Sequence, residues 1–197
     1  VSNGVEVTRV IPNSPADRTD SKLMVDDVIT AVNGTPVDAA TNFYSLFEGE
    51  ANERVLLDVT GGDGAEREVV IRPTTSLRGE LYEEWVEKRR QLTEEYSGGR
   101  LGYIHIQGMN WPSFERFERE LTASGLGKDG IVIDVRYNGG GWTTDMLMTV
   151  LNVRQHAYTV PRGAAADLDK ENQKFRDHYP FGERLPLSAW TKPSVAL

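Results

Sequence analysis

Short alternating runs of apolar and polar residues fill the first part of the chain and predict β-strands separated by turns. Expected strands cover residues 4–11, 27–32, 55–60 and 67–71. A short helix is expected over residues 39–48, with Phe43, Leu46 and Phe47 directed inward. Together these elements predict a small β-rich domain over residues 1–75.

The pattern changes to a helical period after residue 75. Leu81, Trp85, Lys88 and Leu92 fall on one stripe, which predicts an amphipathic helix linking two domains over residues 76–99. Ser97-Gly98-Gly99 ends this helix. A strand over residues 101–106 follows, with Tyr103 and His105 on one face, and then a helix over residues 112–124. Its inward residues are Phe114, Phe117 and Leu121.

The most informative stretch runs from Gly130 to Leu151. Residues 130–135 form an almost continuous apolar run, typical of a strand buried on both faces in a parallel sheet. A glycine-rich turn from Arg136 to Gly141 follows. Thr143 or Thr144 is expected to cap the next helix. The inward residues of that helix are Met146, Leu147, Val150 and Leu151.

The order of strand, helix, strand, glycine turn and helix predicts a β-α-β unit, so the second domain, residues 100–197, belongs to the α/β class. Residues 153–190 show little periodicity and predict a long loop or arm. Residues 193–197 resemble the start of another buried strand. A mixed fold is therefore expected, with a small β-rich domain followed by an incomplete α/β core.

Charge and composition exclude several functions. The chain has 197 residues, a net charge of −8 and no cysteine. The acidic balance argues against nucleic acid or an anionic membrane as a partner, and the lack of cysteine excludes thiol catalysis. No apolar run reaches the roughly 20 residues that a membrane helix needs. We expect a cytoplasmic protein.

The first domain resembles a PDZ domain of the kind attached to proteases. The resemblance rests on VTRVIPNSPAD and on LMVDDVITAVNGTPV, in which Asp26 replaces the usual glycine. PDZ domains bind extended peptides by strand addition. The resemblance implies that Phe43 and Leu46 border a peptide groove, while the loop that binds the peptide carboxylate would lie before Val1. Tethering of a substrate and simple spacing or packing both remain open as roles.

The second domain resembles the catalytic core of tricorn protease and its bacterial relatives. The segments that carry the resemblance are LYEEWVEKRR with RLGYIHI, GIVIDVRYNGGG, and HAYTVPRG. The family implies a serine peptidase that cleaves oligopeptides, with no cofactor. In the glycine turn, Gly140 and Gly141 occupy the positions of the oxyanion site, and the donor would be the Gly141 N–H. The alternative is that the glycines only permit a tight turn between strand and helix.

Two departures from the family pattern limit the comparison. The element that carries the family's serine nucleophile, and with it the second oxyanion donor, is absent, and the histidine base would lie before Val1. We therefore expect this chain alone to be inactive. Tyr158, Thr159 and Arg162 lie in the segment that leads to the substrate. Thr159 stands where an aspartate selects basic residues in tricorn, so that preference is not expected here.

The remaining candidates favour no other chemistry. His105, His156 and His178 are scattered and predict no metal site. Ser188 and Ser194, with Lys192 as a base, lack the setting of a nucleophile. The resemblance implies peptide substrates and a homo-oligomeric, hexamer-like parent protein. The rival hypothesis is a non-catalytic, PDZ-type peptide-binding or scaffold protein.

Overall fold

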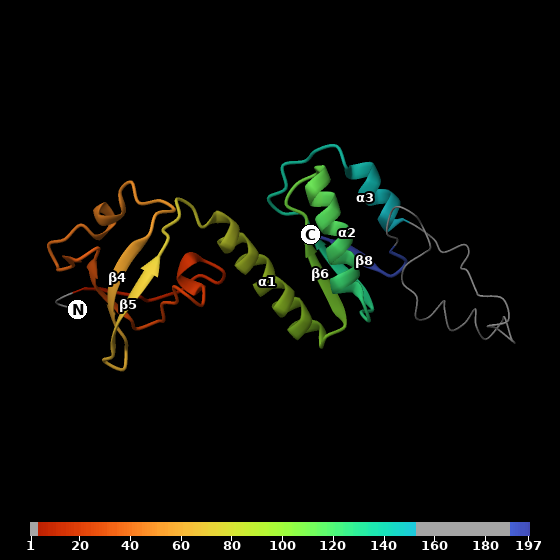
Figure 1. Cartoon of the computed structure of the whole chain (residues 1–197). Coiled ribbons are helices and arrows are strands. Elements are labelled where there is room, and N and C mark those ends of the chain that lie inside the picture. Colours follow the sequence, from red (N-terminus) through yellow and green to blue (C-terminus); the bar gives the residue numbers. More distant parts are fainter. Residues whose placement is uncertain (1–3, 153–189) are drawn as a thin grey trace, which may run out of the picture. The chain divides into compact units, whose positions relative to one another are not determined.

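The computed structural model describes residues 4–152 and 190–197, which belong to two compact units, Val1–Trp85 and Val86–Leu197 (Figure 1). The division between the units falls within helix α1 (Arg78–Ser97). Each unit has its own sheet and its own buried apolar core. The first sheet is antiparallel and the second is parallel.

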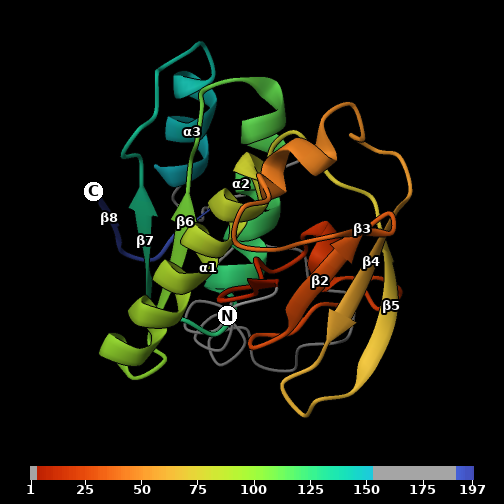
Figure 2. The same ribbon diagram turned by 90° about the vertical axis from the view of Figure 1, so that its left-hand side faces the viewer.

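The antiparallel sheet of the first unit has the strand order β1-β2-β4-β5, with β3 paired to β2 (Figure 2). Its strands are β1 (Val5–Glu6), β2 (Val28–Val32), β3 (Thr35–Pro36), β4 (Val55–Thr60) and β5 (Glu66–Ile71). The sequence predictions for β2, β4 and β5 are therefore confirmed to within a residue. The Asn33-Gly34 turn has positive φ at both residues, as a tight hairpin turn requires.

Two predictions for the first unit are wrong in extent. The expected strand over residues 4–11 is reduced to Val5–Glu6, because regular pairing with β2 ends there and the chain turns at residues 12–14. The expected helix over residues 39–48 is only a 3₁₀ turn, Phe43–Phe47. The Asp38 carboxylate accepts hydrogen bonds from the Ala40 N–H and the Thr41 hydroxyl, which holds residues 38–41 in a turn instead.

The core of the first unit lies between its sheet and the turns that cover it. Alternation along β4 directs Val55, Leu57 and Val59 inward, and all three are at most 2% exposed. The carboxylate of Asp27 is also buried, and it pairs with the Arg67 guanidinium from β5. Because an unpaired buried carboxylate is costly, this ion pair is needed to keep Asp27 inside.

The parallel sheet of the second unit has the order β6-β7-β8, with β7 in the centre. Its elements in chain order are β6 (Leu101–His105), α2 (Trp111–Gly125), β7 (Gly130–Asp134), α3 (Thr144–Leu151) and β8 (Ser194–Ala196). The predicted β-α-β unit is confirmed, and so is a strand near the carboxyl end, but β8 is exposed and not buried as predicted. None of the helices in the described residues is long and apolar enough to cross a membrane.

The two faces of this sheet carry different residues. Ile104 and Ile133 are register partners on the face that packs against α2 and α3. The same core contains Phe114, Phe117, Leu121, Leu147, Val150 and Trp190. The opposite face carries Tyr103, His105 and Asp134, all buried. A polar face that is also buried must satisfy its own hydrogen bonds, and it lies directly before the glycine turn.

The predicted helix ends are largely confirmed. α1 ends at Ser97, and Gly98 and Gly99 follow with positive φ. α3 begins at Thr144 after the N-cap residue Thr143, but the Thr143 side chain forms no capping hydrogen bond. The predicted cap is therefore right in position and wrong in mechanism, because the buried Thr143 hydroxyl has no hydrogen-bond partner among residues 4–152 and 190–197.

Candidate active site

The glycine turn follows the carboxyl end of the central strand β7. Asn138 ties this turn to the end of β6, because its side-chain amide donates to the Ile106 carbonyl oxygen at 2.8 Å. The other end of the same side chain, Oδ1, accepts a hydrogen bond from the Gly140 N–H at 2.7 Å. One side chain thus attaches the turn to the end of β6 and also fixes the backbone conformation of the turn at Gly140.

Gly141 occupies a position that only glycine fits. Its φ is +150°, and a Cβ built there would collide with the carbonyl oxygen of Met109. The close approach is part of an isolated parallel bridge between Met109 and Gly141. Gly140 needs glycine for its φ of +85°, whereas the space around it is open.

The bridge leaves the N–H of Gly141 available. Met109 donates to the Gly140 carbonyl at 3.3 Å and accepts from the Trp142 N–H at 2.9 Å. In this parallel pattern the N–H and C=O of the residue between them, Gly141, point away from Met109. Among the described residues, the Gly141 N–H donates no hydrogen bond, and Gly141 is exposed. The Gly140 N–H, in contrast, is engaged with Asn138.

An ion pair between the buried Asp134 carboxylate and the half-exposed Arg136 side chain supports the start of the turn. The Arg136 guanidinium donates to Asp134 through Nε at 2.9 Å and Nη2 at 2.5 Å, and the Arg136 N–H also donates to Asp134. Burial alone would raise the pKa of the Asp134 carboxyl, but these hydrogen bonds and one from Tyr103 hold that pKa well below its usual range. Asp134 is therefore an ionised anchor.

Two residues of β6 complete this polar layer. The Tyr103 hydroxyl donates to Asp134 at 2.7 Å, and burial together with the Asp134 charge raises the pKa of Tyr103 well above its ordinary value. His105 Nε2 lies 2.9 Å from the Arg136 carbonyl oxygen. Because a carbonyl only accepts, Nε2 carries the proton and His105 is a structural donor to the turn.

The substrate-binding residues predicted from the sequence fall into two groups. Tyr158, Thr159 and Arg162 lie outside the described residues. Phe43 and Leu46 lie in the first unit, half-buried against its apolar core. Their expected role at a peptide groove therefore stays a prediction.

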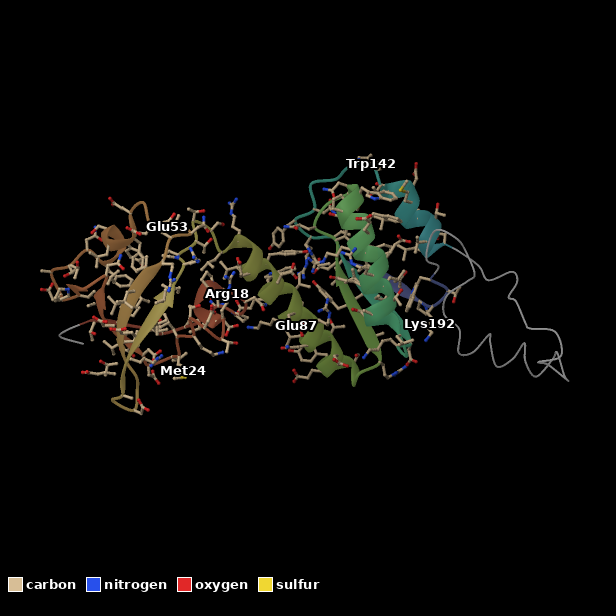
Figure 3. The ribbon with its side chains drawn as sticks, viewed as in Figure 1. Arg18, Met24, Glu53, Glu87, Trp142 and Lys192 are labelled. Carbon is tan, nitrogen blue, oxygen red and sulfur yellow. The ribbon has the colours of Figure 1, made fainter. Side chains whose placement is uncertain are left out.

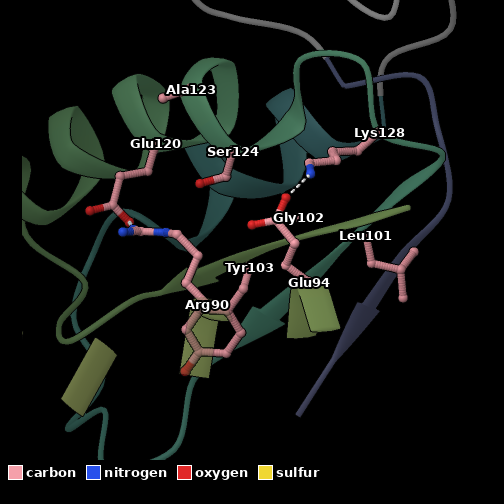
Figure 4. Close-up of a pocket in the computed structure, with 9 residues that line it drawn as sticks. All are labelled: Arg90, Glu94, Leu101, Gly102, Tyr103, Glu120, Ala123, Ser124 and Lys128. Carbon is pink, nitrogen blue, oxygen red and sulfur yellow. Dashed lines mark hydrogen bonds and ion pairs between the residues drawn. The ribbon is translucent and has the colours of Figure 1, made fainter. Parts of the chain in front are cut away.

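A hollow of about 340 Å³ opens elsewhere in the second unit, between α1, β6 and α2 (Figure 4). Its charged side chains are arranged in opposite pairs, Lys128 with Glu94 at 2.8 Å and Arg90 with Glu120 at 3.7 Å. Paired charges offer a ligand little net attraction. In addition, the described residues contain no group of three or more metal-ligating side chains. The glycine turn is thus the better candidate site.

Asn138 is the functional residue that sequence reasoning missed. A signal was present, because asparagine before a flexible residue commonly bonds the backbone two positions further on, as Asn138 does with Gly140. The pairing of Trp142 with Trp111 was also missed. Those two residues are 31 positions apart, and no local pattern predicts their contact.

Comparison with known proteins agrees with this geometry. Residues 6–60 match the model for a PDZ domain, and residues 100–197 match the model for peptidase family S41. A tricorn protease homolog of Saccharolobus solfataricus is 38% identical over 141 residues, which cover 72% of this chain. The chain belongs to the tricorn protease family. Tricorn protease homolog 1 of Streptomyces coelicolor is 34% identical over 166 residues, or 80% of the chain.

The fold of the family is also shared. The crystal structure of the tricorn protease superposes with a TM-score of 0.65 and 25% identity, covering 83% of this chain. The chain spans only 13% and 16% of the length of the two tricorn homologs, and 16% of the chain in that crystal structure. It therefore contains a PDZ domain and part of a family S41 domain, corresponding to a small part of each relative.

Proposed function

We propose that the chain is part of a serine peptidase that hydrolyses oligopeptides, in which the Gly141 N–H is an oxyanion donor. The observation that carries the proposal is the exposed, uncommitted N–H of Gly141 at the carboxyl end of β7. Sites in open α/β sheets lie at this end of the strands. The relatives' names, tricorn protease and its homologs, support the reaction class.

The proposed chemistry requires a fixed donor. When a serine oxygen attacks a peptide carbonyl, negative charge develops on the carbonyl oxygen, and a pre-positioned N–H about 2.7–3.1 Å away stabilises it. Asn138 and the Met109 bridge hold the turn before the substrate arrives, so little reorganisation is needed. Losing one such donor typically lowers kcat by about 10²- to 10³-fold.

The nucleophile and its base are assigned to the protein that contains this chain, outside residues 1–197. His105 lies within the buried polar layer, where its Nε2 donates to the Arg136 backbone carbonyl, so it serves the structure of the turn. The proposed site is therefore divided, with this chain contributing one oxyanion donor.

Labelling of the full-length protein with a fluorophosphonate tests the proposal. We expect a covalent adduct on a serine outside residues 1–197, located by peptide mass spectrometry, together with loss of oligopeptide hydrolysis. An adduct on a serine within the chain would refute the proposed division of the site. No adduct on well-folded protein would contradict the peptidase proposal and favour a non-catalytic scaffold.

The first unit and the assembly are further parts of the proposal. We assign to the PDZ domain the tethering of an extended peptide beside its sheet, with Phe43 and Leu46 at the groove. The parent protein is proposed to be a cytoplasmic homo-oligomer of endopeptidase subunits, hexamer-like as the resemblance implies. Sedimentation of the full-length protein tests the assembly, and a monomer at micromolar concentration would contradict it.

A further inference from the structure

Two large aromatic side chains are exposed beside the glycine turn. Trp142 is 64% exposed and directly follows Gly141, and Trp111 at the start of α2 is 44% exposed. Their rings stack with centroids 6.4 Å apart and an interplanar angle of 5°. Figure 3 labels Trp142 at the end of the second unit where this turn lies. Exposed apolar patches commonly mark interaction sites, so this pair of exposed indoles indicates a binding role.

The pair is held in place from several sides. The Trp111 indole N–H donates to Glu115 at 2.9 Å, and the ring also lies 5.6 Å from that of Phe114, a core residue. Asn110 caps α2 by accepting from the Ser113 N–H at 3.0 Å, which sets the position of Trp111. The Trp142 backbone is fixed by its bond to Met109. Such a rigid aromatic surface loses little conformational entropy on binding.

The position of the tryptophan pair beside Gly141 determines which part of a bound peptide it can contact. A peptide whose scissile carbonyl accepts from Gly141 passes within one residue of Trp142, since successive Cα atoms are about 3.8 Å apart. An extended substrate advances about 3.3 Å per residue, so an indole reaches the side chains within about two residues of that carbonyl. The ring faces are apolar, and the indole N–H of Trp111 is already bonded to Glu115.

We propose that the Trp111–Trp142 pair is a subsite that receives a bulky apolar or aromatic side chain of the peptide, within two residues of the cleaved bond. The inference rests on the proposed function and adds the substrate class to it. Aromatic and large aliphatic side chains gain from burial and from contact with the indole faces. Small polar and acidic side chains gain neither.

Cleavage-site profiling of the full-length protein tests the subsite. A mixed peptide library is digested by the wild type, by Trp142→Ala and by Trp142→Phe, and the products are sequenced by mass spectrometry. We expect Trp142→Ala to reduce the preference for Phe, Leu and Trp near the cleaved bond by about tenfold, and Trp142→Phe to retain most of it. Tyr96→Ala is the matched control, because Tyr96 is 81% exposed but lies at the far end of α1.

The possible failures are distinguishable. Normal fluorophosphonate labelling with an unchanged cleavage profile in Trp142→Ala would overturn the subsite and leave the peptidase proposal intact. Dissociation of an oligomer by Trp142→Ala would instead identify the pair as an interface and also overturn the subsite.

If the wild type neither labels nor cleaves, the peptidase proposal fails and binding decides the subsite. Saturation-transfer NMR then compares an acetylated, amidated Phe tripeptide with its Ser analogue on this chain. Transfer to the Phe peptide that disappears in Trp142→Ala would support an apolar peptide site. Equal signals in both proteins would overturn it.

Discussion

The Asn138 side chain forms two hydrogen bonds that position the glycine turn, so its removal tests how the turn is held. Asn138→Ala deletes the bonds to Ile106 and Gly140 and lets the glycine turn move. We predict that kcat of the full-length enzyme falls about 10- to 100-fold with little change in KM, because the lost interaction matters in the transition state. Gly139→Ala is the control, since a Cβ there meets open space. Equal kinetics for wild type and Asn138→Ala would refute this role.

Substitution of Gly141 tests whether its close approach to the Met109 carbonyl is needed for stability. Gly141→Ala must move the Met109 carbonyl and adopt a φ that other residues avoid. We predict a decrease in the free energy of unfolding of about 2–4 kcal/mol, measured by urea denaturation. Gly139→Ala should change it by less than about 0.5 kcal/mol. Similar values for the two variants would show that the close approach at Gly141 is unimportant.

Asp26 is a residue at which the chain departs from the usual PDZ pattern and carries strain. It has a φ of +72°, is exposed, and its carboxylate forms no hydrogen bond among the described residues. A left-handed conformation costs most residues about 1–2 kcal/mol, and the entropy cost of glycine is about 0.5–1 kcal/mol. Asp26→Gly is therefore predicted to stabilise the protein by about 0.5–1 kcal/mol in thermal or urea unfolding.

A matched substitution separates this effect from the loss of an acidic charge. Asp20 is also exposed and has no positive φ. Asp20→Gly removes the same charge but only increases the freedom of the unfolded chain, so we expect slight destabilisation. Stabilisation of both variants to the same extent would point to charge instead of backbone strain.

At the scale of elements, the polar face of the parallel sheet makes stability depend on pH. The pKa of Tyr103 is higher in the folded state than its ordinary value of 10.0, so its contribution is complete below pH 10 and is lost as pH rises further. We predict that the urea midpoint of the wild type falls above pH 10. Tyr103→Phe should be less stable at pH 7 and lose less above pH 10. Parallel curves for the two proteins would contradict this role of Tyr103.

At low pH, stability changes with pH in the opposite direction, and the residue responsible is Asp134. The pKa of Asp134 is lowered from its ordinary value of 3.8, so its contribution is present above that value and is lost as pH falls below it. The same urea titration checks this limb. A midpoint that stays constant down to pH 2 would contradict the role of the buried Asp134 carboxylate and its pairing with Arg136.

The elements that a local pattern specifies were predictable from the sequence. β4 has apolar residues at every second position from Val55 to Val59, β7 is an apolar run, and the inward residues of α2 share one helical face, so each was predicted closely. Residues 38–41 were not, because the Asp38 side chain competes with the helical backbone. The glycine turn was located by its composition. The orientation of the Gly141 N–H depends on Met109, 32 positions earlier, which no local pattern reveals.

At the scale of the whole molecule, the divided site predicts that this chain alone lacks peptidase activity. A protein of residues 1–197 should hydrolyse no oligopeptide and show no fluorophosphonate adduct, while the full-length protein does both. The physical reason is that one oxyanion donor cannot act without a nucleophile and a base. Hydrolysis of an oligopeptide or a fluorophosphonate adduct on the 197-residue protein would contradict the division.

The most direct measurement is a structure of the full-length protein after reaction with a fluorophosphonate. The phosphonyl oxygen of the tetrahedral adduct occupies the position of the oxyanion and carries partial negative charge. We predict that this oxygen lies about 2.7–3.1 Å from the backbone nitrogen of Gly141, with Asn138 still hydrogen-bonded to Ile106 and Gly140. A phosphonyl oxygen bound by other donors, with the Gly141 N–H facing solvent, would contradict the role of Gly141 as an oxyanion donor.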